Sequence, residues 1–126
     1  MSDVDFQNPS YVKLKNVDAA QAQLSVQALL LDGETVAIAF KGSRDMVCFT
    51  GKRIIAMNVQ GLTGKKTDFT SLPYSKVQAF AVETAGGFDR DCELELWFSG
   101  LGKARFEFEA GYDIVGLSRW LAHFIL

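Results

Sequence analysis

The amino-acid sequence predicts a mainly β domain with flanking helices, in the α+β class. After Gly33 apolar residues recur at every second position through most of the chain, which is the period of half-buried strands. Before Gly33 and after residue 112 they recur at helical spacing instead. Phe, Trp and Tyr make up 12% of the residues, and these side chains suit pleated surfaces. Seven short strands followed by one amphipathic helix predict a curled antiparallel barrel closed by the C-terminal helix.

We assign residues 1–16 to an N-terminal extension and residues 17–126 to one domain, because 126 residues fit a single domain. The first predicted element is a helix over residues 17–31. Asp18 and Gln21 have the spacing of a capping box, and Asp32-Gly33 ends the helix. The apolar stripe at helical spacing consists of Ala20, Leu24, Ala28 and Leu31.

Seven strands are predicted within residues 35–109, separated by turns that contain Gly or Pro. The alternation is clearest in the last hairpin, where residues 91–99 and 103–109 flank a Gly-Leu-Gly turn. A helix over 113–126 follows, with Asp113 as its N-cap. The side chains predicted to point inward are Cys48, Ile54, Phe106, Phe108, Leu117 and Leu121.

Short motifs along the chain also follow one another in a characteristic order. They are Leu31-Asp32-Gly33-Glu34, Arg44-Asp45, Phe49-Thr50, Lys52-Arg53, Gln60-Gly61, Thr63-Gly64-Lys65-Lys66, Pro73-Tyr74, Val82-Glu83-Thr84-Ala85-Gly86, Phe88-Asp89, Asp91, Glu93-Leu94 and Ser99-Gly100. Together they resemble the bacterial pleckstrin-homology (PH) domain family over about residues 15–126. The resemblance implies a PH-like seven-stranded barrel with an extra N-terminal helix. It also implies no catalytic residue, an unknown function and assembly into higher oligomers.

Charge and cysteine content exclude several function classes. The net charge is −2 and no dense basic run occurs, so nucleic acid is not an expected partner. Cys48 and Cys92 match no metal-ligand spacing and make no disulfide framework. No secretory signal or membrane-spanning apolar run is present in this sequence. We therefore expect a reduced, cytoplasmic protein without a cofactor, for which a membrane is not the expected partner.

Three groups of residues could carry chemistry, and a structural role is favoured for each. Asp89, Asp91 and Glu93 share a strand face that could hold calcium, but they lack the calcium-loop pattern, so capping or ion pairing is favoured and no metal is expected. Lys41 and Arg44 flank the first hairpin turn and are weak anion-site candidates. That two-residue turn is too short to cradle a multiply charged headgroup. The other group comprises the single histidine and the two cysteines, which suggest no nucleophile–base pair, so no enzyme is expected.

Trp97, Leu24 and Leu30 are the candidate interface residues. Trp97 falls on the polar face of its strand, where it either marks a contact surface or is covered by the N-terminal helix. Leu30 lies off the main stripe of that helix. The preferred hypothesis is a non-enzymatic assembly module that forms homo-oligomers larger than a dimer or docks an unidentified protein partner. The alternative is a recruitment module that binds an anionic lipid or another small anionic ligand.

Overall fold

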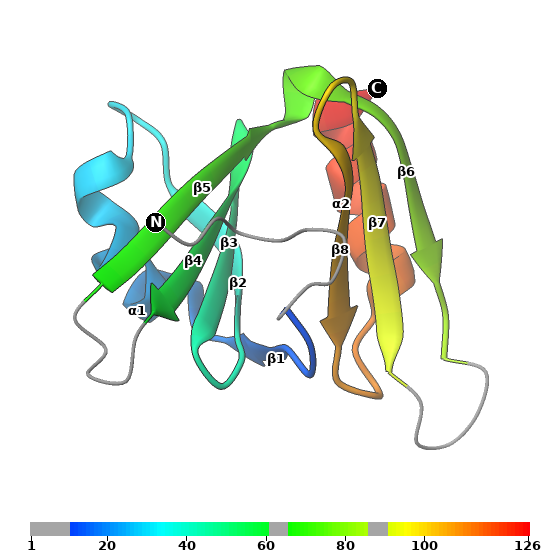
Figure 1. Ribbon diagram of the computed structural model, residues 1–126, viewed down its shortest axis with the longest axis horizontal. Coiled ribbons are helices and arrows are strands. Elements are labelled where there is room, and N and C mark those ends of the chain that lie inside the picture. The colour runs from blue at the N-terminus through cyan, green and yellow to red at the C-terminus, as the bar shows by residue number, and fades with distance from the viewer. Residues whose placement is uncertain (1–10, 61–65, 86–90) are drawn as a thin grey trace. The chain divides into compact units, whose positions relative to one another are not determined.

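Strands dominate the structure, as the alternating pattern predicts. The computed structural model describes residues 11–60, 66–85 and 91–126 (Figure 1). The elements fall into two compact units. One is Lys15–Tyr74, and the other joins residues 11–14 with Ser75–Leu126.

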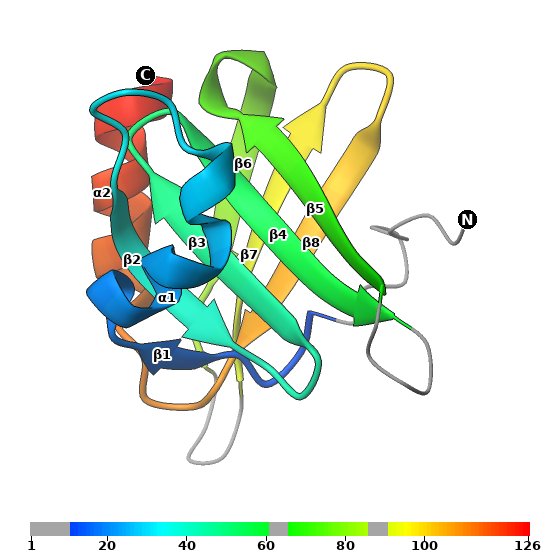
Figure 2. The ribbon, with the colours of Figure 1, turned by 90° about the vertical axis from the view of Figure 1, so that its left-hand side faces the viewer.

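The first unit contains a five-stranded antiparallel sheet in the order β1-β2-β3-β4-β5 (Figure 2). The strands are β1 Lys15–Val17, β2 Val36–Lys41, β3 Asp45–Thr50, β4 Arg53–Gln60 and β5 Lys66–Pro73. Each strand of this sheet pairs with the next along the chain, and α1 lies in the connection between β1 and β2. The helix-bearing connection places α1 across one face of this sheet (Figure 2).

Helix α1 covers only Ala19–Val26 and continues as a 3₁₀ turn, η1, over Gln27–Leu29. Asp18 is its N-cap, since the Asp18 carboxylate accepts a hydrogen bond of 3.0 Å from the amide of Gln21. The helix is therefore shorter than the predicted 17–31. Residues 15–17 form a strand instead.

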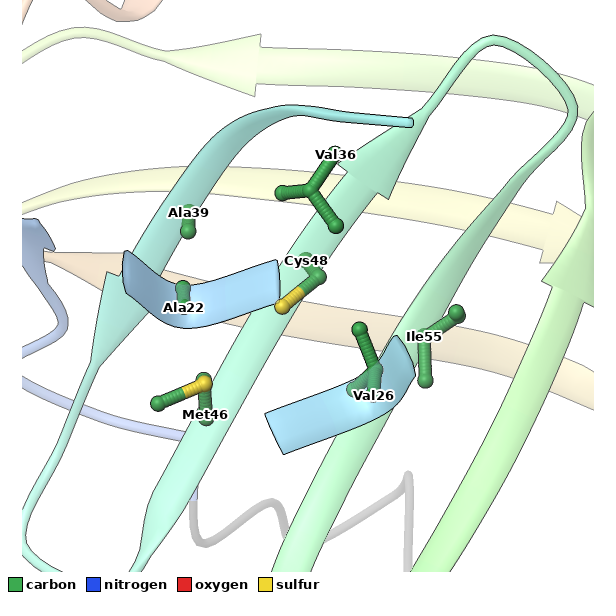
Figure 3. Close-up of a cluster of buried hydrophobic side chains, with 7 residues drawn as sticks. All are labelled: Ala22, Val26, Val36, Ala39, Met46, Cys48 and Ile55. Atoms are coloured by element: carbon green, nitrogen blue, oxygen red, sulfur yellow. The ribbon is translucent and has the colours of Figure 1, made fainter. Parts of the chain in front are cut away.

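The apolar stripe at helical spacing is not the side of α1 that packs on the sheet. The side chains that pack on the sheet are Ala22 and Val26, which lie against a cluster that includes Cys48 and Ile55 (Figure 3). The four stripe residues that the spacing predicts are all exposed: Ala20, Leu24, Ala28 and Leu31. Residues 19–31 contain no charged side chain. Charge therefore does not distinguish the buried face of this helix from the exposed face.

The second unit contains a three-stranded antiparallel sheet in the order β6-β7-β8 (Figure 1). The strands are β6 Val77–Glu83, β7 Cys92–Phe98 and β8 Gly102–Phe108, and a 3₁₀ turn, η2 Tyr74–Lys76, precedes them. Residues 11–14 run along β8, because the Leu14 amide donates to the Glu107 carbonyl at 3.0 Å and the Glu107 amide to the Tyr11 carbonyl at 2.9 Å. This pairing covers the outer edge of β8.

Helix α2 spans Ile114–Ile125 and packs on β6 and β7. Asp113 caps it as predicted, with its carboxylate accepting from the Gly116 amide at 3.0 Å. A β-carbon at Gly116 would lie 2.2 Å from the Asp113 carboxylate, so a larger residue there would require that carboxylate to shift. The mainly β class with a C-terminal helix is confirmed.

The predicted core and the seven strands predicted within residues 35–109 are confirmed. All six side chains predicted to point inward are at most 2% exposed. The seven predicted strands correspond to β2–β8, and the described residues contain one further strand, the short β1, where an extension and the start of a helix were predicted. Three residues are too few for their alternation to identify a strand.

Candidate functional site

Several exposed apolar side chains lie on α1 and on the residues that follow it. We define the α1 outer face as Ala20, Leu24, Ala28 and Leu31. Leu24 is 68% exposed and Leu31 is 60% exposed. Charged residues are depleted at the centres of protein interfaces, and this segment has none. Leu30, the other predicted interface residue of this segment, instead packs against the core cluster beneath α1.

A buried ion pair fixes the chain that follows this face. The side chain of Glu34 is 1% exposed and lies 2.8 Å from a guanidinium nitrogen of Arg53. A second guanidinium nitrogen donates to the other carboxylate oxygen at 3.0 Å, so the pair is bidentate. The same guanidinium donates to the Leu29 carbonyl at 2.6 Å and to the Ser71 hydroxyl at 2.9 Å. Arg53 thus joins the end of η1 to β4 and β5.

Two further donors complete the environment of the Glu34 carboxylate. The Thr50 hydroxyl donates to it at 2.7 Å and the Leu31 amide at 3.0 Å. Burial alone raises the pKa of Glu34. Hydrogen bonds from Arg53, Leu31 and Thr50, together with the Arg53 charge, outweigh that effect and lower the pKa to about 2. Glu34 is therefore ionised at neutral pH although it is buried.

A groove runs between α1 and the β2–β3 hairpin. We define the α1–hairpin groove as two adjoining hollows of about 340 and 310 Å³ that share Ser25, Lys41 and Met46. Arg44 lines the second hollow, so the structure brings the two predicted anion-site residues together. Two acidic residues also line the groove, Asp18 in the first hollow and Asp45 in the second.

Trp97 lies on the charged face of the second sheet, opposite Ala79 of β6 and Lys103 of β8. It is 36% exposed, and the ammonium group of Lys103 lies 6.0 Å from the centre of its ring. The same ammonium group forms an ion pair of 2.6 Å with Glu95. Trp97 is thus an exposed aromatic residue with polar neighbours, which is the composition of a contact surface.

Next to Trp97 the charges on this face are paired within the sheet. Arg105 forms ion pairs with both Glu93 and Glu107, and its guanidinium lies 2.7 Å from the Glu107 carboxylate. Glu93 therefore has a structural role, as favoured above, with Arg105 as its partner. Asp89 lies outside the described residues, and within the described ranges no group of three or more His, Cys, Asp or Glu side chains could hold a metal ion.

The two cysteines are buried and unpaired with each other. Burial raises the pKa of Cys48 to about 11 and also raises the pKa of Cys92. Both thiols stay protonated at neutral pH, which makes them poor nucleophiles. No helix in the described part of the chain is long and apolar enough to cross a membrane.

Comparisons with known proteins identify the family. Residues 5–125 match the sequence profile of the bacterial PH domain. YjqA, an uncharacterized protein of Bacillus subtilis strain 168, is 50% identical over 84 residues, which make up 67% of this chain and 67% of YjqA.

Solved structures agree with this match. A DUF1696 family protein with a pleckstrin-homology domain, from Shewanella loihica PV-4, has a TM-score of 0.80 and 39% identity over 91% of this chain and 99% of its own. A pleckstrin homology domain from Shewanella amazonensis SB2B has a TM-score of 0.68 and 40% identity over 87% of this chain and 90% of its own. This chain therefore belongs to the bacterial pleckstrin-homology domain family.

Proposed function

We propose that this chain is a non-enzymatic, cytoplasmic assembly module that forms homo-oligomers larger than a dimer. The observation that supports the proposal is the α1 outer face, where Leu24 and Leu31 are exposed on a segment without charged residues. Exposed apolar patches on a small domain usually mark a partner surface. The two buried cysteines, which are poor nucleophiles, offer no competing catalytic role.

The exposed Trp97, which lies apart in sequence from the α1 outer face, supports an assembly larger than a dimer. Trp97 lies in the second unit and the α1 outer face in the first. A single self-complementary patch gives a dimer, whereas two different patches that meet head to tail continue until a ring closes. The α1 outer face and the surface around Trp97 are the two patches we assign to this contact.

Light scattering after size exclusion tests the assembly. At micromolar concentration we expect a particle mass of more than two copies of the 13.9 kDa chain. Leu24→Glu should reduce the mass, because it places a charge in an apolar contact, and Trp97→Glu should do the same. Lys52→Glu, an exposed change at the β3–β4 turn, is the control and should leave the mass unchanged. A wild-type chain that elutes only as a monomer contradicts the proposal.

The second candidate function is recruitment to an anionic lipid or small anion, and Lys41 and Arg44 in the α1–hairpin groove favour it. Asp18, Asp45 and the net charge of −2 oppose it. In vesicle flotation with phosphatidylserine or phosphoinositides at physiological salt, we expect the protein to remain in solution. Salt-sensitive flotation that is lost in the double variant Lys41→Glu, Arg44→Glu would instead place recruitment first.

A further inference from the structure

One row of side chains crosses the five-stranded sheet beside α1. The strand register places Lys15 opposite Lys41, Lys41 opposite Met46, Met46 opposite Met57, and Met57 opposite Phe69. Directly opposite residues point to the same face of a sheet, so the row has two cations at one end and apolar side chains along the rest. At about 4.8 Å between strands it spans about 19 Å. We call it the Lys–Met row.

The Lys–Met row forms part of the floor of the α1–hairpin groove. Ala39 and Cys48 lie two residues from Lys41 and Met46 along their strands, so they share the same face, and α1 covers them. Met46 and Met57 line the hollows. Because α1 packs on residues of β2, β3 and β4, it crosses the strands and forms a side wall of the groove (Figure 3).

The two lysines at the cationic end of the row form no ion pair in the described part of the chain, although Asp18 lines the same hollow as Lys41. Like charges directly opposite each other in an antiparallel pair destabilise a sheet, and Lys15 and Lys41 are such a pair. Both are exposed. The apolar end is incompletely covered as well, since Phe69 is 42% exposed. An occupant with a negative end and an apolar body would satisfy both ends.

We propose that the Lys–Met row, of which Lys41, Met46 and Met57 line the α1–hairpin groove, binds an amphipathic helix of another protein. The apolar face of that helix would lie on Met46, Met57 and Phe69, and its acidic residues over Lys15 and Lys41. A helix of about 13 residues spans the row at 1.5 Å per residue. Methionine side chains adapt to varied apolar partners, which suits a peptide-binding floor. The acidic residues of such a helix are most favourably placed in its first turn, because the helix dipole stabilises negative charge there.

A second copy of this chain is a poorer occupant. The described helices of this chain, α1 and α2, contain no Asp or Glu between their first and last residues. They cannot place a carboxylate over Lys15 and Lys41 from the helix body. A membrane is also a poorer occupant, because Lys41, Met46 and Met57 of the row line hollows that a flat lipid surface does not enter.

Fluorescence anisotropy with three labelled 16-residue peptides tests the proposal on the full chain. The first peptide is an amphipathic helix with leucine on one face and glutamate elsewhere. The second has lysine in place of glutamate, and the third has the first composition with the leucine stripe scrambled. We expect the first peptide to bind at least tenfold more tightly than each of the others. The double variant Lys15→Glu, Lys41→Glu should weaken its binding at least tenfold, and so should Met57→Glu.

A matched double variant, Lys52→Glu and Lys76→Glu, makes the same charge change outside the row and should alter the affinity less than twofold. Circular dichroism shows whether each variant is folded. If the double variant Lys15→Glu, Lys41→Glu is not folded, the double variant Lys15→Gln, Lys41→Gln is used in its place. Equal affinity for the three peptides, no binding of the first peptide, or binding unaffected by the Lys15 and Lys41 changes overturns the proposal. Binding to anionic vesicles that depends on Lys15 and Lys41, without peptide binding, assigns the row to a membrane. These results do not depend on particle mass, so they are separate from the test of assembly.

Discussion

Arg53→Met is expected to destabilise the chain by about 3–5 kcal/mol, because it leaves the Glu34 carboxylate buried without its counter-charge. The Glu34 side chain is 1% exposed and cannot turn to water without moving the segment between η1 and β2. The variant also removes the donors to Leu29 and Ser71. Urea denaturation of wild type and variant at pH 7 and at equal protein concentration measures the difference in the free energy of unfolding.

A double-mutant cycle separates the ion pair from the other losses. Glu34→Gln removes the charge but keeps the shape, and in the double variant neither charge remains buried. We expect the double variant to be less destabilised than the sum of the single variants, since the unpaired carboxylate is the main cost of Arg53→Met. Additive effects would show that Glu34 and Arg53 are not coupled.

The same pair predicts a dependence of stability on pH. The pKa of Glu34 is lowered from 4.5 to about 2 in the folded chain. Below pH 4.5 the unfolded chain takes up this proton first, so the stability from Glu34 is complete above that pH and is lost as the pH falls towards 2. In Arg53→Met the folded pKa of Glu34 should rise, because the guanidinium that lowers it is absent. The free energy of unfolding should then fall less steeply between pH 5 and pH 3 than it does in wild type.

The parts of the fold that the sequence predicted are those where one face is apolar and the other charged. In β7 and β8, Leu94 and Phe106 alternate with Glu93 and Arg105, and the predicted burial was confirmed. Helix α1 offers no such contrast, and its sequence does not identify which face is buried. Alanines and leucines occur on both of its sides, so only the sheet beneath determines that Ala22 and Val26 are the residues in contact.

The candidate site could be predicted from the sequence only where it is local. Lys41 and Arg44 are neighbours across a hairpin turn, and the structure places both on the same hollow. Lys15 was missed, because its proximity to Lys41 depends on the pairing of β1 with β2 across the intervening helix. Glu34 and Arg53 belong to motifs that carried the family resemblance, but their separation of 19 residues gives no sign that they meet.

Leu117→Ala is expected to destabilise the chain by about 2–5 kcal/mol, because it removes a buried side chain that α2 contributes to the core. Leu117 is 2% exposed and lies between Ile114 and Leu121 on the buried side of α2. Val115→Ala on the same helix is the control, since Val115 is 51% exposed and surface changes usually alter stability by about 0.5 kcal/mol or less. Assembly raises apparent stability, so both variants are compared with wild type at one protein concentration. Equal unfolding free energies for the two variants would show that α2 does not contribute to the core through Leu117.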